Sequence, residues 1–189
     1  MRTTMYVNVV DLIMNDHREL ERIFEQVRTQ PDQRPTLVPV MITLLTAHSR
    51  AEEAEVYPAA LEAGIADDVE HSQKEHIEAD QLAADVAASD VDAPDFDEKL
   101  QKLIDAVTHH VEEEESKVLP GMRQAMSVER LGELGRSFAA SRQQHLGERP
   151  ADVTKAELEQ QAANAGISGA SSQSKADLSA TLKDAAEDE

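Results

Sequence analysis

The chain has 189 residues, of which 40% are hydrophobic and 30% charged, so it can bury the core of one domain and carry a short appendage. Its 18 basic and 38 acidic side chains give a formal net charge of −20, which disfavours binding to nucleic-acid phosphates or to anionic membranes. Because the chain has no cysteine, disulfides, thiolate metal sites and cysteine nucleophiles are excluded.

Apolar residues recur at every third or fourth position, which is the period of a helix, and the alternating β-branched runs typical of strands are missing. The first segment has no apolar run long enough for a signal peptide or a membrane span, so we expect a cytoplasmic protein with no membrane partner. Its apolar stripe consists of Val10, Ile13, His17, Leu20, Phe24 and Val27. A second stripe follows Pro31 and Pro35, runs before Pro58 and Gly64, and consists of Leu37, Met41, Leu45, His48, Glu52 and Val56.

Three more helices are predicted further along the chain. The third covers about residues 67–88, with Val69, His76, Ala83 and Val86 facing inward. The fourth is expected to stop at Pro120 and Gly121, and its stripe is Phe96, Leu100, Leu103, Val107, His110, Glu114 and Val118. The fifth covers about residues 127–146 and carries Val128, Leu131, Leu134 and Phe138. Because the connections are short, we predict an all-α fold, an up-down four-helix bundle with a fifth helix.

The composition shifts towards Ala, Ser and Gln after Pro150, and the remaining segment predicts two short helices joined by a Gly/Ser loop. We therefore divide the chain into a bundle, residues 1–149, and a small, flexible helical appendage, residues 150–189. The motifs TKAEL, GISG and SKADL, between residues 153 and 183, make this tail resemble the helix-loop-helix of Rho termination factors and SAP-like modules. Such modules bind nucleic acid through basic surfaces, whereas this tail is acidic, so a protein contact or a spacer role is favoured.

Four histidines lie at positions where the stripes predict core residues, one on each of the first four helices: His17, His48, His76 and His110. A single histidine on an apolar stripe is usually a hydrogen-bonded core residue. A bundle interior cannot solvate four of them, and a shared metal ion would satisfy their lone pairs together. Glu52 and Glu114 each follow a histidine by four residues, so both members of each pair share a helix face and the buried stripe.

A repeat supports this interpretation. HSRAEEAEVYP begins at His48 and HVEEEESKVLP begins 62 residues later at His110, and both have Glu at the fourth and fifth following positions and Pro at the tenth. The chain thus predicts two helical hairpins, each contributing one lone histidine and one His-x-x-x-Glu pair. Over residues 8–146 this pattern resembles the hemerythrin family in its bacterial form, the HHE cation-binding domain. No Glu-x-x-His pair typical of ferritin-like carboxylate bundles is present.

The resemblance implies a four-helix bundle with two irons, bridged by two carboxylates and a solvent-derived oxo or hydroxo group. It assigns metal-ligand roles to His17, His48, Glu52, His76, His110 and Glu114, with both glutamates as bridges. We expect the tail to take no part in this site. The sequence departs from the oxygen-carrying members on the third helix, where Ser72 stands four residues before His76 in place of a second histidine. That ligand is either missing or supplied by a residue from this set: Tyr57, His71, Asp80 and Glu21.

Two other histidines receive no metal role from the sequence. We expect His109 to face solvent, because it is about 100° from His110 on the helix, and His145 to pack within the fifth stripe. The resemblance implies that the protein binds or reacts with dioxygen, hydrogen peroxide or nitric oxide. Its role would then be oxygen binding or a response to oxidative stress. Three classes stay open: a binding or sensing protein with a partner at the tail, a catalase-like di-iron enzyme that decomposes peroxide, and an iron storage or repair donor.

Overall fold

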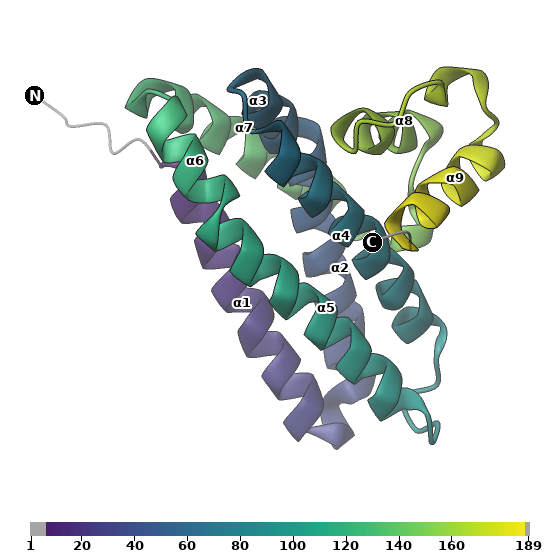
Figure 1. The fold of residues 1–189 in the computed structure, drawn as a ribbon. Coiled ribbons are helices and arrows are strands. Elements are labelled where there is room, and N and C mark those ends of the chain that lie inside the picture. Colours follow the sequence, from purple (N-terminus) through teal and green to yellow (C-terminus); the bar gives the residue numbers. More distant parts are fainter. Residues whose placement is uncertain (1–6, 188–189) are drawn as a thin grey trace, which may run out of the picture.

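The computed structural model describes residues 7–187, and within that range the chain forms helices and no strand. Four long helices run alternately in opposite directions and lie side by side: α1 (Val9–Thr29), α2 (Arg34–Ala51), α4 (Ala66–Ala88) and α5 (Phe96–Ser116) (Figure 1). A fifth helix, α7 (Val128–His145), packs against α1 and α2. The predicted all-α, up-down four-helix bundle with a fifth helix is confirmed.

The shorter elements connect the long helices or form the C-terminal tail. They are the 3₁₀ turn η1 (Pro31–Gln33), the π-helix η2 (Glu52–Val56), α3 (Tyr57–Glu62), α6 (Val118–Ala125), the 3₁₀ turns η3 (Pro150–Asp152) and η4 (Ala170–Ser172), α8 (Lys155–Asn164) and α9 (Lys175–Glu187). No helix within residues 7–187 has the length and apolarity needed to cross a membrane.

The apolar core of the bundle contains two clusters, and three of the stripe histidines, His17, His48 and His76, lie between them along the chain. One cluster joins the lower parts of the four long helices and includes Leu20, Phe24, Val107 and Leu100. The other joins their upper ends to α3, α6 and α7. On α1, for example, Ile13 belongs to the second cluster and Leu20 to the first, so His17 stands between them. The polar groups are therefore held in a layer closed above and below by apolar side chains.

The end of the fourth helix differs from the prediction. The helix breaks at Lys117, where φ is −121° and ψ is −67°, and Pro120 and Gly121 lie inside the following helix α6 rather than stopping it. Proline is tolerated in the first turn of a helix, because the amide it lacks would have no intrahelical partner there. Val128, predicted to face the core, is 68% exposed because it is the first residue of α7, directly after the N-cap Ser127.

Helix α7 crosses close to the start of α1, and a glycine makes this crossing feasible. A Cβ atom at position 135 would overlap the carbonyl oxygen of Val7, so any residue other than glycine would push the two helices apart. Glycine thus fixes how closely the fifth helix can approach the bundle.

The C-terminal tail forms the two predicted helices and lies along the outer side of α4 (Figure 1). The helix α8 begins with a capping box, in which Thr154 and Glu157 bind each other's backbone amides. Ile77 of α4 is buried in a third apolar cluster formed with side chains of the tail, namely Leu158, Ala162, Leu178 and Leu182. A domain boundary at residue 150 stays a prediction.

Candidate metal centre

The four stripe histidines are all buried and form two neighbouring pairs. His17 and His48 have ring centroids 5.1 Å apart, and those of His76 and His110 are 4.5 Å apart. The exposed fraction of these four residues is between 0% and 5%. Within the second pair, the two Nε2 atoms are 3.0 Å apart. Helices that are distant in sequence thus aim four imidazoles into one layer of the bundle.

Two glutamates complete this layer, and Glu52 stands between the two histidine pairs. Its Oε2 atom lies 3.2 Å from Nε2 of His48 and 3.3 Å from Nε2 of His76. The Oε2 atom of Glu114 lies 3.3 Å from Nε2 of His17. Both glutamates are 0% exposed.

The donor atoms fall into two groups, each compact enough to surround one ion. One group is His17, His48 and Glu52, and the other is Glu52, His76 and His110; within each group the donor atoms lie within 4.8 Å of one another. Glu52 belongs to both groups. Two adjacent metal positions sharing one carboxylate are therefore compatible with the geometry.

Several of these buried atoms have no hydrogen bond. Nε2 of His17 and both carboxylate oxygens of Glu52 and of Glu114 are buried and lack a hydrogen-bond partner. Leaving a buried carboxylate unsatisfied costs several kcal/mol, on the order of the penalty for an unpaired buried ion. Cations placed among these atoms would remove that cost, so the residues present fit a metal centre.

A π-helix explains why a tyrosine also reaches this layer. Residues Glu52–Val56 form π-helical turns, in which hydrogen bonds join residues five apart, so Glu52 and Tyr57 project towards the same side of the chain. Tyr57 is 0% exposed, and its Oη atom lies 3.0 Å from Nε2 of His76. Among the four additional ligand candidates from the sequence, Tyr57 is the one that lies in the buried layer.

The other three candidates lie elsewhere. Glu21 is exposed and accepts a hydrogen bond at 2.7 Å from Arg18. Asp80 pairs with the buried Arg50, whose Nη1 atom is 2.8 Å from Oδ2 of Asp80. His71 is partly exposed and lies near Glu75, outside the layer. None of these three residues belongs to either group of buried donor atoms, so their positions do not favour them as a replacement for the missing third-helix histidine.

The two histidines without a predicted metal role differ in outcome. His109 faces solvent, with 63% of its side chain exposed, as expected. His145, expected to pack within the fifth stripe, is partly buried, with 18% of its side chain exposed. Its Nδ1 atom lies 2.9 Å from Glu148 and 3.7 Å from Glu157 of α8, so it makes polar contacts between the end of α7 and the tail.

Each buried histidine also faces a carboxylate with its outer nitrogen, and two of these contacts lie within a helical hairpin. Nδ1 of His48 on α2 is 3.3 Å from Asp16 of α1. Nδ1 of His110 on α5 is 2.9 Å from Glu75 of α4. In both cases the carboxylate is the residue directly before the buried histidine of its own helix, but it serves the histidine of the next helix.

The other two contacts join the hairpins. Nδ1 of His76 on α4 is 3.4 Å from Glu53 of α2, and Nδ1 of His17 on α1 is 2.8 Å from Glu115 of α5. Together the four contacts form a closed ring, α1 to α2 to α4 to α5 and back to α1. Carboxylates that hold the outer nitrogen of a metal-binding histidine fix its tautomer and orientation and increase its basicity.

Sequence analysis did not assign a role to these four carboxylates: Asp16, Glu53, Glu75 and Glu115. Each is adjacent in sequence to a predicted ligand, and this adjacency is a usable signal. Successive residues on a helix differ by 100°, so the neighbour of an inward residue points towards an adjacent helix. Which helix it reaches depends on the packing and cannot be read from one segment.

The electrostatics of the layer are dominated by pairing between imidazoles and carboxylates. Burial would lower the pKa of His48, but Glu52 and Asp16 outweigh it and raise that pKa to about 10. Burial is likewise outweighed at His76, where Glu52 and Glu53 raise the pKa to about 10. Despite its burial, the pKa of Glu53 falls to about 2, chiefly because of Arg50. Protons and metal ions therefore compete for the same nitrogen atoms.

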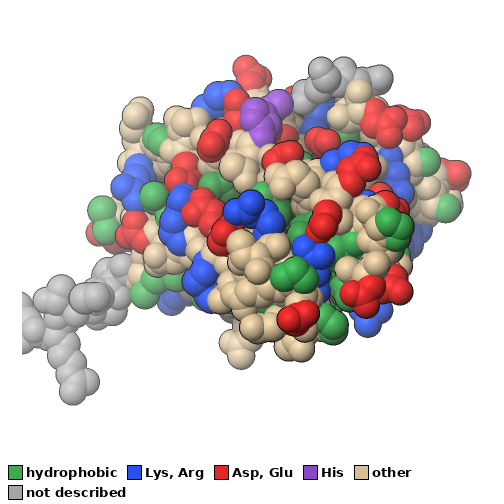
Figure 2. Space-filling view, turned by 90° about the horizontal axis from the view of Figure 1, so that it is seen from below, with side chains coloured by type: hydrophobic (Ala, Val, Ile, Leu, Met, Phe, Trp, Pro, Cys, Tyr) green, Lys and Arg blue, Asp and Glu red, His purple; other side chains and the backbone are tan. Residues whose placement is uncertain are grey.

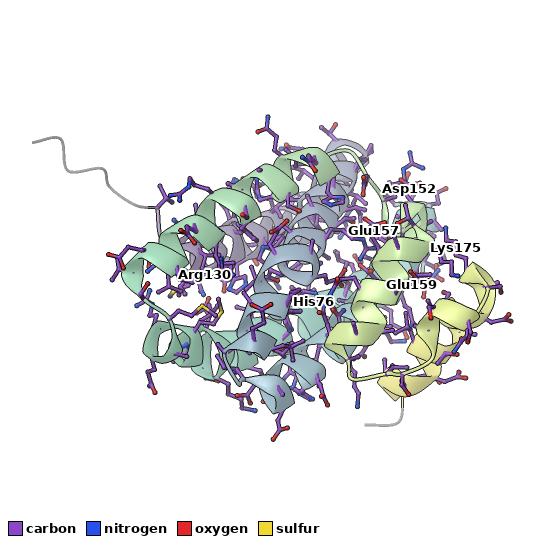
Figure 3. The ribbon with its side chains drawn as sticks, turned by 90° about the horizontal axis from the view of Figure 1, so that it is seen from above. His76, Arg130, Asp152, Glu157, Glu159 and Lys175 are labelled. Carbon is purple, nitrogen blue, oxygen red and sulfur yellow. The ribbon has the colours of Figure 1, made fainter. Side chains whose placement is uncertain are left out.

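The C-terminal tail contacts this centre indirectly, through Glu53. Nε2 of Gln161 donates to both carboxylate oxygens of Glu53, at 3.2 and 3.1 Å, and Nδ2 of Asn164 donates to its carbonyl oxygen at 3.0 Å. Figure 3 shows α8 and α9 along one side of the bundle, next to the helix that carries His76. The expectation that the tail takes no part in the site needs correction, because it holds a carboxylate that contacts His76.

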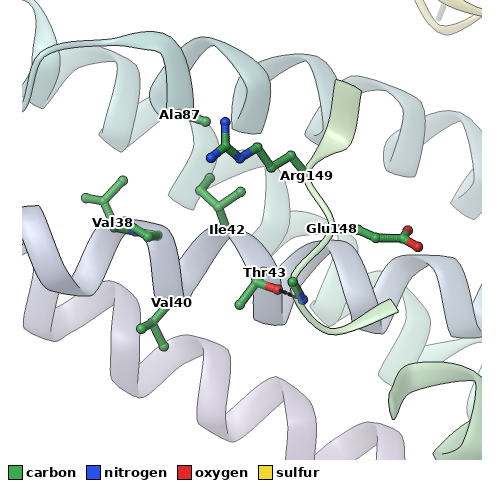
Figure 4. A pocket seen from close by; sticks show the side chains of 9 residues that line it. Val38, Val40, Ile42, Thr43, Ala87, Glu148 and Arg149 are labelled. Carbon is green, nitrogen blue, oxygen red and sulfur yellow. Dashed lines mark hydrogen bonds between the residues drawn. The ribbon is translucent and has the colours of Figure 1, made fainter. Parts of the chain in front are cut away.

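A surface cavity of about 440 Å³ lies apart from the centre, between α2, α4 and the segment that follows α7 (Figure 4). Its lining is mainly apolar, with Val38 and Ile42 on α2 and Ala87 on α4, and the charged residues Glu148 and Arg149 stand at its side. None of the buried histidines lines it.

Comparison with known proteins agrees with this geometry. The hemerythrin HHE cation binding domain matches residues 8–121. A protein of Nostoc sp. (strain PCC 7120 / SAG 25.82 / UTEX 2576) named "DNA nickase" is 28% identical over 146 residues, which cover 75% of this chain and 42% of that protein. The chain thus spans about two fifths of the length of this curated relative. No solved structure matches the chain.

Proposed function

Because the chain belongs to the hemerythrin family, we propose that it is a non-haem di-iron protein that binds or reacts with a small ligand: dioxygen, hydrogen peroxide or nitric oxide. The observation that carries this proposal is the set of buried donor atoms without hydrogen bonds, namely Nε2 of His17 and the carboxylate oxygens of Glu52 and Glu114. Mixed imidazole and carboxylate ligands suit iron, with manganese and zinc as competitors.

We assign one iron to each group of donor atoms. His17 and His48 would hold the first, and His76 and His110 the second, with Glu52 and Glu114 as bridging carboxylates. The shared position of Glu52 supports its bridging role, and the burial of Glu114 beside His17 supports the second bridge. When bound, the irons supply the ligand binding and the electron transfer.

The residues of the chain orient the imidazoles and exclude water from the buried layer. The ring of carboxylates at the outer nitrogens holds each imidazole with its Nε2 atom inward. The apolar clusters on both sides of the layer keep bulk water away from the charged groups. Tyr57, from α3, places a phenol oxygen beside His76 of α4, the helix on which the oxygen-carrying members have a further imidazole.

The position of this tyrosine supports peroxide decomposition as a second candidate function. A phenolate oxygen stabilises ferric iron more than an imidazole does, and ferric centres are poor reversible carriers of dioxygen. The position of Tyr57 therefore supports a peroxide-decomposing, catalase-like di-iron enzyme as the second candidate function. An iron storage or repair donor is the third, and it requires metal that leaves the centre readily.

One experiment separates these functions. Iron content and the visible spectrum of aerobically purified protein are measured before and after addition of peroxide, with an oxygen electrode in the same vessel. We expect about two irons per chain. Steady evolution of oxygen supports the enzyme, a persistent adduct supports the carrier, and rapid transfer of iron to a chelator supports the donor. One equivalent of zinc, with no uptake of iron under anaerobic reconstitution, would refute the di-iron proposal.

The name of the Nostoc relative raises cleavage of DNA as a further activity. The net charge of −20 opposes association with the phosphate backbone, so we expect no nucleic-acid partner for this chain. The acidic tail fits a protein contact better, for the same reason. Incubation of the iron-loaded protein with supercoiled plasmid tests this expectation, and strand nicking above that of free iron would contradict it.

A further inference from the structure

Two more histidines lie just outside the buried centre, on the surface between α4 and α5. Nε2 of His71 is 3.4 Å from Oε1 of Glu75 and 3.5 Å from Oε2 of Glu113. Nε2 of His109 is 3.5 Å from the same Oε1 atom of Glu75. One donor atom from each of His71, Glu75 and His109 lies within 4.8 Å of the others. This is the spacing expected of three ligands around one ion.

The two carboxylate oxygens of Glu75 face different surroundings, one towards the buried layer and one towards the surface histidines. Its Oε2 atom lies 2.9 Å from Nδ1 of the buried His110. Its Oε1 atom is buried without a hydrogen-bond partner and faces the two surface histidines, although the side chain is only 10% exposed. A hydrogen bond at the inner oxygen fixes the orientation of this carboxylate, so the outer oxygen is held in place towards His71 and His109.

The surroundings of these residues favour a cation. His71, Glu75 and His109 line an open cavity of about 560 Å³. Its lining also includes three further carboxylates, Glu78, Asp85 and Glu187, and one lysine, Lys74. Figure 2 shows histidine at the molecular surface with acidic side chains beside it. Four carboxylates and one lysine give the lining a net negative charge, which raises the local concentration of cations.

We propose that His71, Glu75 and His109 form a second metal site, which binds one divalent transition-metal ion at the surface. Two imidazoles and one carboxylate leave an open position for water, a ligand set that suits zinc, cobalt, manganese or ferrous iron rather than calcium or magnesium. The site uses donor atoms other than those of the proposed di-iron centre. The two are connected by Glu75, which contacts a buried ligand with one oxygen and faces the surface site with the other.

Cobalt(II) is the probe that tests this site. The full-length protein, carrying whatever iron it has after purification, is dialysed against micromolar Co²⁺, and iron and cobalt are then counted in the same sample. We expect His109→Ala and His71→Ala to bind one cobalt ion fewer per chain than the native protein, with the iron content unchanged. Because the readout is a difference between variants, it stands whether or not the buried centre contains iron.

Glu78→Gln is the matched control. It removes a charge from the same cavity without removing a proposed ligand, so it should bind as many cobalt ions as the native protein. Both histidines are at least 38% exposed, so their replacement leaves the fold intact, which circular dichroism verifies. The proposal is overturned if His109→Ala and His71→Ala bind as much cobalt as the native chain. It is also overturned if Glu78→Gln loses the cobalt ion as well, because the cavity would then hold cobalt through its negative charge alone and not through specific ligands.

Discussion

The phenol oxygen of Tyr57 lies 3.0 Å from Nε2 of His76, in a layer where neither residue is accessible to solvent by more than 2%. The π-helix that precedes Tyr57 brings about this contact, since a regular α-helix would rotate the residue five positions after Glu52 away from it. The contact gives the proposed centre an oxygen donor on the side where an imidazole is missing.

Tyr57→Phe should change the colour of the oxidised protein without emptying the centre. The change removes one oxygen atom and keeps the ring, so we expect unchanged iron content and helicity, and loss of the visible band that a phenolate bound to ferric iron produces. Absorption spectra of the two proteins, recorded at equal iron content, check this. If the spectra coincide, Tyr57 is a neighbour of the metal rather than a ligand.

Replacement of adjacent histidines should have opposite results. His110→Ala removes an inward imidazole and takes away the hydrogen-bond partner of Glu75 Oε2, so we expect loss of iron and of about 3 kcal/mol of stability. His109→Ala changes a side chain that is 63% exposed and should cost less than about 0.5 kcal/mol while keeping the buried iron. Iron analysis and thermal unfolding of both variants would show whether the register of α5 assigns the ligand correctly, and a reversed result would refute it.

Gln161→Ala should destabilise the protein, although Gln161 belongs to the C-terminal tail and not to the bundle. It removes both hydrogen bonds to the buried carboxylate of Glu53, which we expect to cost about 2 kcal/mol in the free energy of unfolding. Gln144→Ala on the exposed side of α7 is the matched change and should cost less than about 0.5 kcal/mol. Urea unfolding of the two variants measures the difference. Equal stabilities would mean that the tail does not hold Glu53 in solution.

The metal-free protein should lose stability as the pH rises from about 7 to 10. In the folded chain the pKa of His48 and that of His76 are raised to about 10, whereas an unfolded histidine titrates near 6.5. Protonation therefore favours the folded state fully below about pH 6.5, and this contribution disappears as the pH approaches 10. Thermal unfolding at several pH values, with and without bound iron, measures the effect.

Iron-loaded protein is the control for that titration, since its histidines are already deprotonated as ligands and its stability should depend less on pH over the same range. A metal-free protein with constant stability between pH 6.5 and 9.5 would contradict the proposed pairing of these imidazoles with Glu52.

Periodicity was sufficient to predict the bundle and the inward-facing histidines, because both follow from which residues share a helix face. His17, for instance, is 0% exposed, as its place between Ile13 and Leu20 indicates. Local departures from the regular helix were not predictable in this way. The position of Tyr57 depends on a π-helix, and the end of α5 depends on a break at Lys117, which precedes the proline that marks it in the sequence.

Contacts between helices were the other part that the sequence could not supply. Glu53 and Glu115 follow ligands directly, yet each serves a histidine on a different hairpin, and this choice is made by packing. Gln161 lies 108 residues after Glu53, and no periodicity within the tail indicates that a glutamine there would reach the bundle interior.

The ring of carboxylates is nearly symmetric between the two hairpins, but its surroundings are not. His48 with Glu52 on one hairpin corresponds to His110 with Glu114 on the other, 62 residues later, while the position equivalent to Tyr57 is occupied by Leu119. The amide groups of the tail likewise hold Glu53 and not Glu115. Two metal ions in this layer would therefore be chemically inequivalent, because one would have a phenol oxygen beside it and the other would not. Such ions differ in reduction potential and in affinity, so the centre would fill and change oxidation state one ion at a time.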